Sequence, residues 1–172
     1  MGISLYEATV ERFLQGLGGL AGVLEKSQAH FAESNNDLSQ IVETRLWRDM
    51  LPFNYQVVAA AHHSLGAVEG VRQGVFSPPD REAHSYPELQ VLVAQTLAKL
   101  QSITASEVNA MEGRNVVFKI GEREIPYVAE GFLLSFSLPN FYFHATTAYD
   151  ILRFKGVPLN KRDYIGKPRI SA

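Results

Sequence analysis

The chain of 172 residues contains no cysteine. Disulfide bonds, thiolate catalysis and thiolate-bound zinc are therefore excluded. An excess of one charge is also missing, because 16 basic residues nearly balance 18 acidic ones and leave a formal net charge of -2. Since this balance gives no overall electrostatic attraction to nucleic acid or to acidic membranes, we expect neither as a partner.

Targeting signals are absent from the first residues, which lack a basic segment followed by a continuous apolar run. We therefore expect a cytoplasmic protein. The strongly apolar stretch over residues 130–153 is nearly long enough to span a bilayer, but Pro139, Asn140 and His144 lie near its middle. We expect this stretch to be a buried helix of a soluble domain.

Helical periodicity dominates the rest of the chain, and 46% of its residues are hydrophobic. The pattern predicts four long helices and two short ones. The long helices are expected over residues 5–32, 52–73, 85–100 and 130–153, and the short ones over residues 38–45 and 106–111. Ser4, with Glu7 three residues later, has the spacing of a capping box at the start of the first helix. Pro139 should kink the last long helix or locally open its hydrogen bonds. Small residues in the first helix, Gly16 and Gly19 among them, should let a neighbouring helix approach closely.

The pattern changes between residues 115 and 128, where apolar residues alternate around a turn at Gly121 and Glu122. This predicts a short β-hairpin between the third and fourth long helices. Pro126 should place the second strand at a free edge, because proline has no amide hydrogen. We expect one all-α domain over residues 1–172, a four-helix bundle with this hairpin and an extended tail from about residue 156.

A polar stripe runs along the apolar last long helix. Its members recur three or four residues apart and therefore share one helical face. They are Ser137, Asn140, His144 and Thr147. Polar groups in such surroundings need partners, so the stripe suits either a binding site or a buried hydrogen-bond network.

Histidine supplies the only chemically suggestive pattern. His63 shares a face of small residues with Gln56 and Ala67 and should point into the bundle, whereas His62 lies on another face. His63 and His144 could meet across the bundle as ligands of a metal ion. Two ligands are too few for a closed site, and metal-binding spacings such as His-Glu-x-x-His are absent. The same residues also suit satisfied polar groups of the core, which is the commoner role of lone buried histidines. Separately, the aromatic run Phe141, Tyr142 and Phe143 covers several helical faces, which indicates contact with another subunit.

Three segments together resemble a bacterial family of domains of unknown function that is placed with the DinB/YfiT-like four-helix bundles. They are ISLYEATV, RLWRDMLPFNYQV and SLPNFYFHATTAYDILRFKGVPLNKRDYIG. The resemblance covers nearly the whole chain and implies a DinB-like bundle and a homodimer. It also implies a divalent metal, nickel or zinc, which members of the wider group hold with one histidine of the second helix and two of the fourth. Known members of that group include thiol-dependent transferases and related metalloenzymes.

Carried over by residue, the resemblance places the ligand of the second helix at His63, with His62 as a neighbouring candidate, and one ligand of the fourth helix at His144. The other ligand position of the fourth helix is occupied by Asn140, a weaker ligand than histidine. Ser137 and Thr147 are secondary candidates. Asp49, just before the second helix, is a further one, although capping or compensating the helix dipole is its simplest role.

Two hypotheses follow for the function. In the first, a degenerate divalent-metal site at His63, Asn140 and His144 acts on or binds a small molecule. In the second, the protein is a non-catalytic, dimeric small-molecule-binding or stress-related protein without a metal, and the same residues only satisfy the core. No residue pattern in the sequence identifies a reaction, so the sequence does not decide whether the protein is an enzyme.

Overall fold

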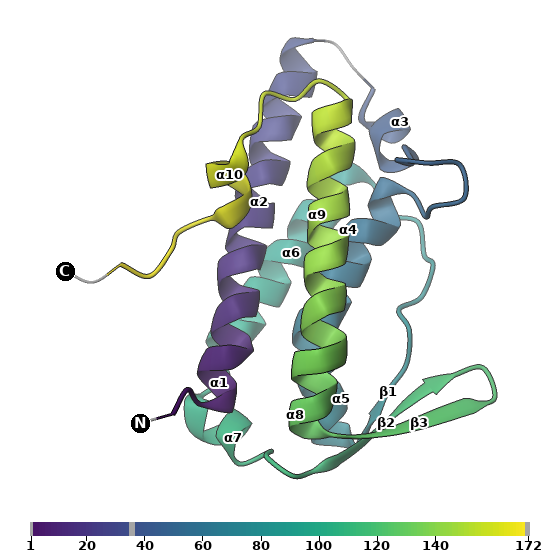
Figure 1. The fold of residues 1–172 in the computed structure, drawn as a ribbon. Helices are drawn as coiled ribbons and strands as arrows, with labels where there is room; N and C mark the ends of the chain where they lie inside the picture. The colour runs from purple at the N-terminus through teal and green to yellow at the C-terminus, as the bar shows by residue number, and fades with distance from the viewer. Residues whose placement is uncertain (1, 35–36, 171–172) are drawn as a thin grey trace.

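The computed structural model describes residues 2–34 and 37–170. Four long helical rods run along a common axis, with a small sheet at one end (Figure 1). In chain order the rods cover residues 5–33, 53–73, 86–101 and 129–154. The helical segments are α1 (Leu5–Ala8), α2 (Val10–Glu33), α3 (Leu38–Val42), α4 (Phe53–Ala61), η1 (His62–Gly66), α5 (Ala67–Gln73), α6 (Tyr86–Gln101), α7 (Ala105–Asn109), α8 (Ala129–Gly131), η2 (Phe132–Ser137), α9 (Leu138–Phe154) and α10 (Lys161–Ile165). The strands are β1 (Val75–Phe76), β2 (Asn115–Ile120) and β3 (Arg123–Val128). The predicted helical bundle with a short hairpin is confirmed.

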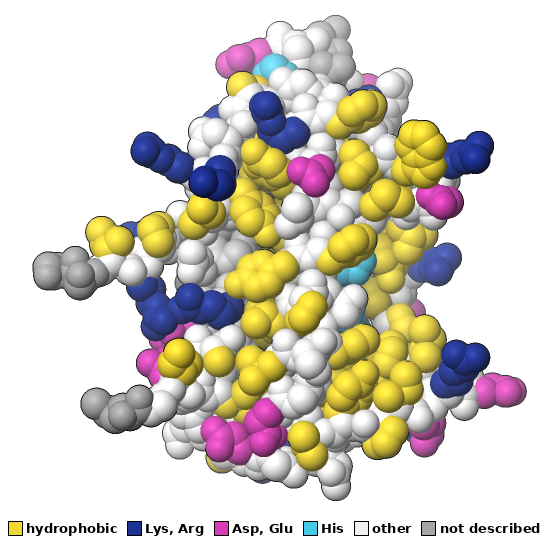
Figure 2. Space-filling model, in the orientation of Figure 1, with side chains coloured by type: hydrophobic (Ala, Val, Ile, Leu, Met, Phe, Trp, Pro, Cys, Tyr) yellow, Lys and Arg dark blue, Asp and Glu magenta, His cyan; other side chains and the backbone are white. Residues whose placement is uncertain are grey.

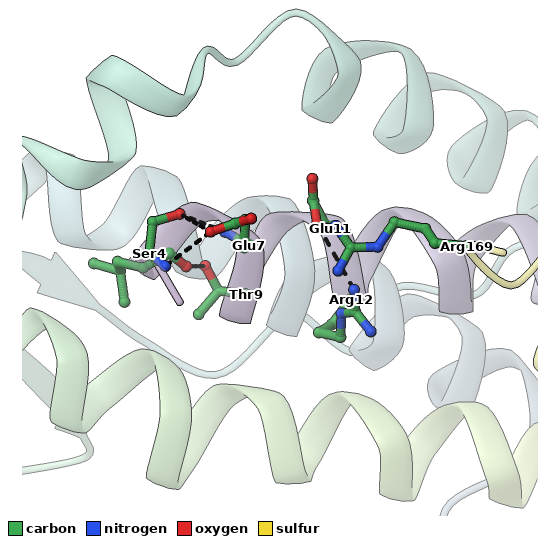
Figure 3. Close-up of polar contacts among 7 residues, drawn as sticks. Ser4, Glu7, Thr9, Glu11, Arg12 and Arg169 are labelled. Atoms are coloured by element: carbon green, nitrogen blue, oxygen red, sulfur yellow. Dashed lines mark hydrogen bonds and ion pairs between the residues drawn. The ribbon is translucent and has the colours of Figure 1, made fainter. Parts of the chain in front are cut away.

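The first rod begins with the expected capping box. The backbone N–H of Glu7 donates to the hydroxyl of Ser4, and the carboxylate of Glu7 accepts from the backbone N–H of Ser4 at 2.9 Å (Figure 3). The prediction of one unbroken helix was wrong, because the rod is interrupted at Thr9, where φ is -122° and ψ is -73°. The Thr9 hydroxyl donates to the Leu5 carbonyl at 2.6 Å, and a side chain bonded to its own helix in this way favours a bend.

The second and fourth rods each contain one π-helical turn. In the second rod, η1 joins α4 to α5, and in the fourth rod, η2 joins α8 to α9. The π turn η2 ends two residues before Pro139, which has no amide hydrogen to donate to the preceding helical turn. The expectation that Pro139 would locally change the hydrogen bonding of its helix is therefore confirmed.

The sheet has three strands in the order β1, β2, β3. The hairpin of β2 and β3 is confirmed, with Gly121 at its turn in the left-handed region (φ 57°). Pro126 lies on the outer strand β3, as expected. Strand β1 was not predicted. It pairs in parallel with β2 through only two residues, Val75 and Phe76, too few to show an alternating pattern.

Two glycines of α2 permit the close contacts expected of them. A Cβ atom placed on Gly16 would lie 2.6 Å from Phe141 of α9, and one on Gly19 would meet the backbone carbonyl of Tyr164. Tyr164 belongs to α10, a short helix in the tail that was expected to be extended. The tail is also tied to α2 by an ion pair between Arg169 and Glu11, beside Arg12 (Figure 3).

Within residues 2–34 and 37–170, none of the helices combines the length and the apolar character that a membrane span requires.

Candidate functional site

His63 and His144 lie beside one another between the second and fourth rods. Their rings are nearly parallel, at an angle of 16°, with centroids 5.8 Å apart. His63 belongs to η1 and is 6% exposed, whereas His144, one turn into α9 from Asn140, is partly buried. The inward orientation expected of His63 is thus observed, and the two histidines meet as the predicted site requires.

The hydrogen bonds of Gln56 determine the tautomer of His144. Gln56 Nε2 donates to the Leu51 carbonyl at 2.8 Å, which leaves Gln56 Oε1 to face His144 Nδ1, also at 2.8 Å. An amide oxygen only accepts, so Nδ1 of His144 carries the hydrogen. The lone pair of the neutral ring is then on Nε2, the nitrogen that can bind a metal ion or accept from a ligand.

His63 makes no hydrogen bond to any described residue, and its Nδ1 is buried. The neighbours of the His63 ring include two aromatic rings. The ring centroids of Phe76 and Phe136 lie 5.4 Å and 5.5 Å from that of His63. A buried polar atom left without a partner costs free energy in a folded protein, so it calls for an explanation.

Burial keeps both histidines neutral at pH 7. The pKa of His63 falls to about 3, first because the ring is buried and then because His144 and His62 lie near it. Burial also lowers the pKa of His144 to about 4. Neutral imidazoles have the free lone pairs that metal ligands and hydrogen-bond acceptors need.

The remaining residues of the polar stripe bond to their own helix or to nothing described. Asn140 Nδ2 donates to the Phe136 carbonyl and Thr147 Oγ1 donates to the Phe143 carbonyl, both at 2.8 Å. Ser137 is fully buried, and its hydroxyl has no partner in residues 2–34 and 37–170. The stripe therefore does not form one network, because only His144 reaches across to another helix.

The other candidates from the sequence lie outside this pair. His62 Nε2 lies 2.6 Å from the Ser77 carbonyl, and its ring stacks on Phe76. Asp49 is exposed in the turn before α4. Among the described residues no side chain caps α4, which starts after Pro52, so the capping role expected of Asp49 is not observed.

Gln56 is the site residue that sequence reasoning did not single out. It was placed on the face of His63, but its part in orienting His144 depends on the relative height of the two rods. The signal in the sequence was its position two turns before His63 on a face of small residues. Tyr55, whose ring meets His144 edge-on at 5.9 Å, was likewise missed.

The site offers two imidazole ligands, His63 and His144, to a metal ion. Residues 2–34 and 37–170 contain no group of three His, Cys, Asp or Glu side chains that could hold one. Two imidazoles fit the requirement in part: one is oriented by Gln56, and the other has a buried nitrogen without a partner. Asn140 has only its amide oxygen to add, since its nitrogen bonds to Phe136. The residues thus fit a two-histidine site and not the three-histidine site that the resemblance implied.

Comparison with known proteins agrees with the fold. The family described as domain of unknown function DUF1993 matches residues 5–165. A crystal structure of a DinB family member protein from Shewanella denitrificans superposes with a TM-score of 0.79, at 25% sequence identity, over 98% of this chain and 95% of that one. No curated protein matches. The chain therefore belongs to the DUF1993 family of domains of unknown function and has a DinB-like fold.

Proposed function

We propose that His63 and His144 form a two-imidazole site for a divalent transition-metal ion, nickel or zinc, and that this site binds a small molecule. The proposal is carried by the buried Nδ1 of His63, which lacks a partner beside a histidine already oriented by Gln56. An ion bound there would supply Lewis-acid chemistry. Whether a reaction follows depends on the molecule that binds.

The surroundings of the two rings support this assignment. Both imidazoles are neutral at pH 7, so neither needs to lose a proton before it binds an ion. Gln56 serves as a positioning residue, because its carbonyl oxygen holds the Nδ1–H of His144 and leaves Nε2 free. With two strong ligands instead of three, the affinity should be lower than that of a closed metal site.

Metal titration tests the proposal. Isothermal titration calorimetry with Ni²⁺ and Zn²⁺ should give about one ion per chain, with metal analysis as a second readout. Both His63→Ala and His144→Ala should abolish binding. His30→Ala, a histidine of α2 next to Phe31, is the matched control and should bind as the wild type does. The proposal would be overturned if the wild type binds neither ion, or if His63→Ala or His144→Ala binds an ion as tightly as the wild type does.

A second candidate function is a non-catalytic binding protein without a metal. It is favoured by the lack of a third strong ligand in the described residues and by the bonds of Asn140 and Thr147 to their own helix. Here His144→Ala would leave the buried Gln56 oxygen unpaired and cost about 1 to 3 kcal/mol, whether or not metal is added. Under the first proposal, added nickel or zinc should stabilise only the wild type.

We further propose a homodimer formed through α9 and the hairpin. Figure 2 shows hydrophobic side chains gathered over this face. Large hydrophobic residues that stay exposed on η2, α9 and the hairpin are Leu134, Tyr142, Phe143, Phe154, Ile120, Ile125 and Val128. Exposed hydrophobic side chains that gather on one face and include aromatic residues are typical of protein interfaces.

A further inference from the structure

A groove lies between the second rod and the connection that follows β1. It consists of two overlapping hollows, of about 340 Å³ and 420 Å³. The residues that line both hollows are His62, Gly66, Glu69, Pro78 and Asp80. Neither His63 nor His144 is among the described residues that line the groove, so the proposed metal site does not account for it.

The walls of the groove are mostly apolar. His62, Gly66 and Glu69 follow one another at intervals of four and three residues and therefore share one face of the second rod. Apolar side chains beside them come from η1, from α6 and from the connection after β1, and include Leu65, Leu92, Pro78 and Pro79. A concave apolar surface with a few polar groups is the usual form of a small-molecule site.

His62 brings an accessible acceptor to the groove. Its Nε2 lies 2.6 Å from the Ser77 carbonyl, which can only accept, so Nε2 carries the hydrogen and Nδ1 of the neutral ring has the lone pair. Nδ1 makes no hydrogen bond within residues 2–34 and 37–170, and it is not buried, unlike Nδ1 of His63. Gly66 leaves it uncovered, because a Cβ atom there would lie only 2.9 Å from Nδ1.

The charged groups of the groove are carboxylates. Glu69 is half-buried and Asp80 is exposed, and neither makes a hydrogen bond or an ion pair with another described residue. Burial lowers the pKa of His62, whereas the hydrogen bond to Ser77 and the charges of Asp80 and Glu69 raise it, so both carboxylates lie near the ring. The described lining contains no lysine or arginine. The groove is therefore complementary to a cation.

The shape of the groove favours an organic cation over a metal ion. In the part of the chain that the structure describes, His62, Glu69 and Asp80 do not come together as a group that could hold a metal ion. A molecule that reaches both carboxylates must extend along the groove and cover its apolar wall. Ammonium groups separated by methylene segments meet both requirements.

We propose that this groove binds an aliphatic polyamine. Its ammonium groups pair with the carboxylates of Glu69 and Asp80, and one of them donates to Nδ1 of His62. Such charge-assisted hydrogen bonds are strong, and the methylene segments pack against Leu65 and Pro79. The two hollows are large enough, because small-molecule pockets begin at about 300 Å³. The groove needs no metal, so this proposal stands or falls independently of the two-histidine site.

Isothermal titration calorimetry of the metal-free protein with putrescine and spermidine tests the proposal. Both amines are fully charged at pH 7 and should bind at about one molecule per chain. Two control ligands separate charge from shape. The diol with the carbon chain of putrescine lacks the ammonium groups, and Mg²⁺ has the charge of putrescine without the chain. Each should bind at least about tenfold more weakly than putrescine.

Three variants locate the site. Glu69→Gln and Asp80→Asn remove one charge each and should each weaken spermidine binding at least about tenfold. Asp80 is exposed, so Asp80→Asn should leave the unfolding temperature unchanged. Gly66→Ala should also weaken binding, because the added methyl group covers Nδ1 of His62.

Glu122→Gln, an exposed carboxylate in the turn of the hairpin, is the matched control and should bind spermidine as the wild type does. The proposal fails if neither amine binds, if the diol or Mg²⁺ binds as tightly as putrescine, or if either Glu69→Gln or Asp80→Asn retains the affinity of the wild type.

Discussion

His144 donates its Nδ1 hydrogen to Oε1 of Gln56 across 2.8 Å and thereby joins α9 to α4. Gln56 is 2% exposed, and its amide is held from the other side by the Leu51 carbonyl. This bond joins two rods, and the two bonded residues are 88 positions apart in the chain. It orients the imidazole and satisfies a buried amide at the same time.

Removing the Gln56 side chain should destabilise the protein. Gln56→Ala leaves the Nδ1–H of the partly buried His144 without its acceptor and should lower the free energy of unfolding by about 1 to 3 kcal/mol, before any cost of the cavity. Urea denaturation measures the change. Gln101→Ala, at the exposed end of α6, is the control and should change stability by less than about 0.5 kcal/mol. Equal effects of the two substitutions would contradict the role given to Gln56.

Stability should decline as the pH falls below about 6.5. The pKa of His63 is lowered to about 3 and that of His144 to about 4, from 6.5 in the unfolded chain. Below pH 6.5 the unfolded chain therefore binds protons that the folded chain does not, and the stability present above that pH is lost by up to about 1.4 kcal/mol per pH unit for each histidine.

Urea denaturation at intervals between pH 7 and pH 5 measures this slope. This pH range separates the protonation of the histidines from that of the capping carboxylates. Glu7 is one of these carboxylates, and hydrogen bonds to Ser4 lower its pKa from 4.5. The stabilisation by Glu7 is lost only at lower pH. His63→Leu should flatten the slope, and an unchanged slope in this variant would show that His63 is protonated in the folded protein.

The glycines of α2 should respond differently to alanine. Gly19→Ala places a methyl group against the Tyr164 carbonyl, so α10 must shift or the protein must lose stability. Gly22→Ala meets nothing within 4 Å and should stabilise the helix by about 0.5 to 1 kcal/mol. Thermal unfolding of the two variants measures the contrast. A stabilising effect of Gly19→Ala would mean that α10 does not pack on α2 in solution.

A charge on the exposed face of α9 should dissociate the proposed dimer. Phe143 is 57% exposed, and Phe143→Glu would place a carboxylate in the proposed interface. Light scattering coupled to size-exclusion chromatography should show a dimer for the wild type and a monomer for the variant. Val91→Glu, at a 53% exposed position of α6, is the control and should remain dimeric. A monomeric wild type would refute the proposed assembly.

The elements that local pattern specifies were predictable from the sequence. The capping box at Ser4 and the turn at Gly121 each depend on a few neighbouring residues, and both formed where expected. Strand β1 depends on its pairing with β2 some forty residues later in the chain, so its two residues gave no local signal. The helix break at Thr9 was missed because one hydroxyl, and not a change in periodicity, accompanies it.

The candidate site was predictable to a similar degree. Helical spacing predicted that His63 points into the bundle, and there its ring lies beside that of His144. Spacing could not show that Asn140 and Thr147 would bond to their own helix, because these bonds depend on side-chain rotamers. Nor could it reveal the groove beside η1, because one of its walls is a connection without regular structure.

The two π turns give the second and fourth rods one residue more than regular α-helices would need over the same length. Removing a single residue from η1 would let the rod continue as a regular α-helix, and the residues on either side would keep nearly their present orientation, because the π turn already accommodates the additional residue. Gln56 would then stay on the face that meets His144, whereas His63 lies within η1 itself and would be displaced. A one-residue deletion in η1 is therefore expected to disturb the pairing of His63 with His144 while leaving the rod intact.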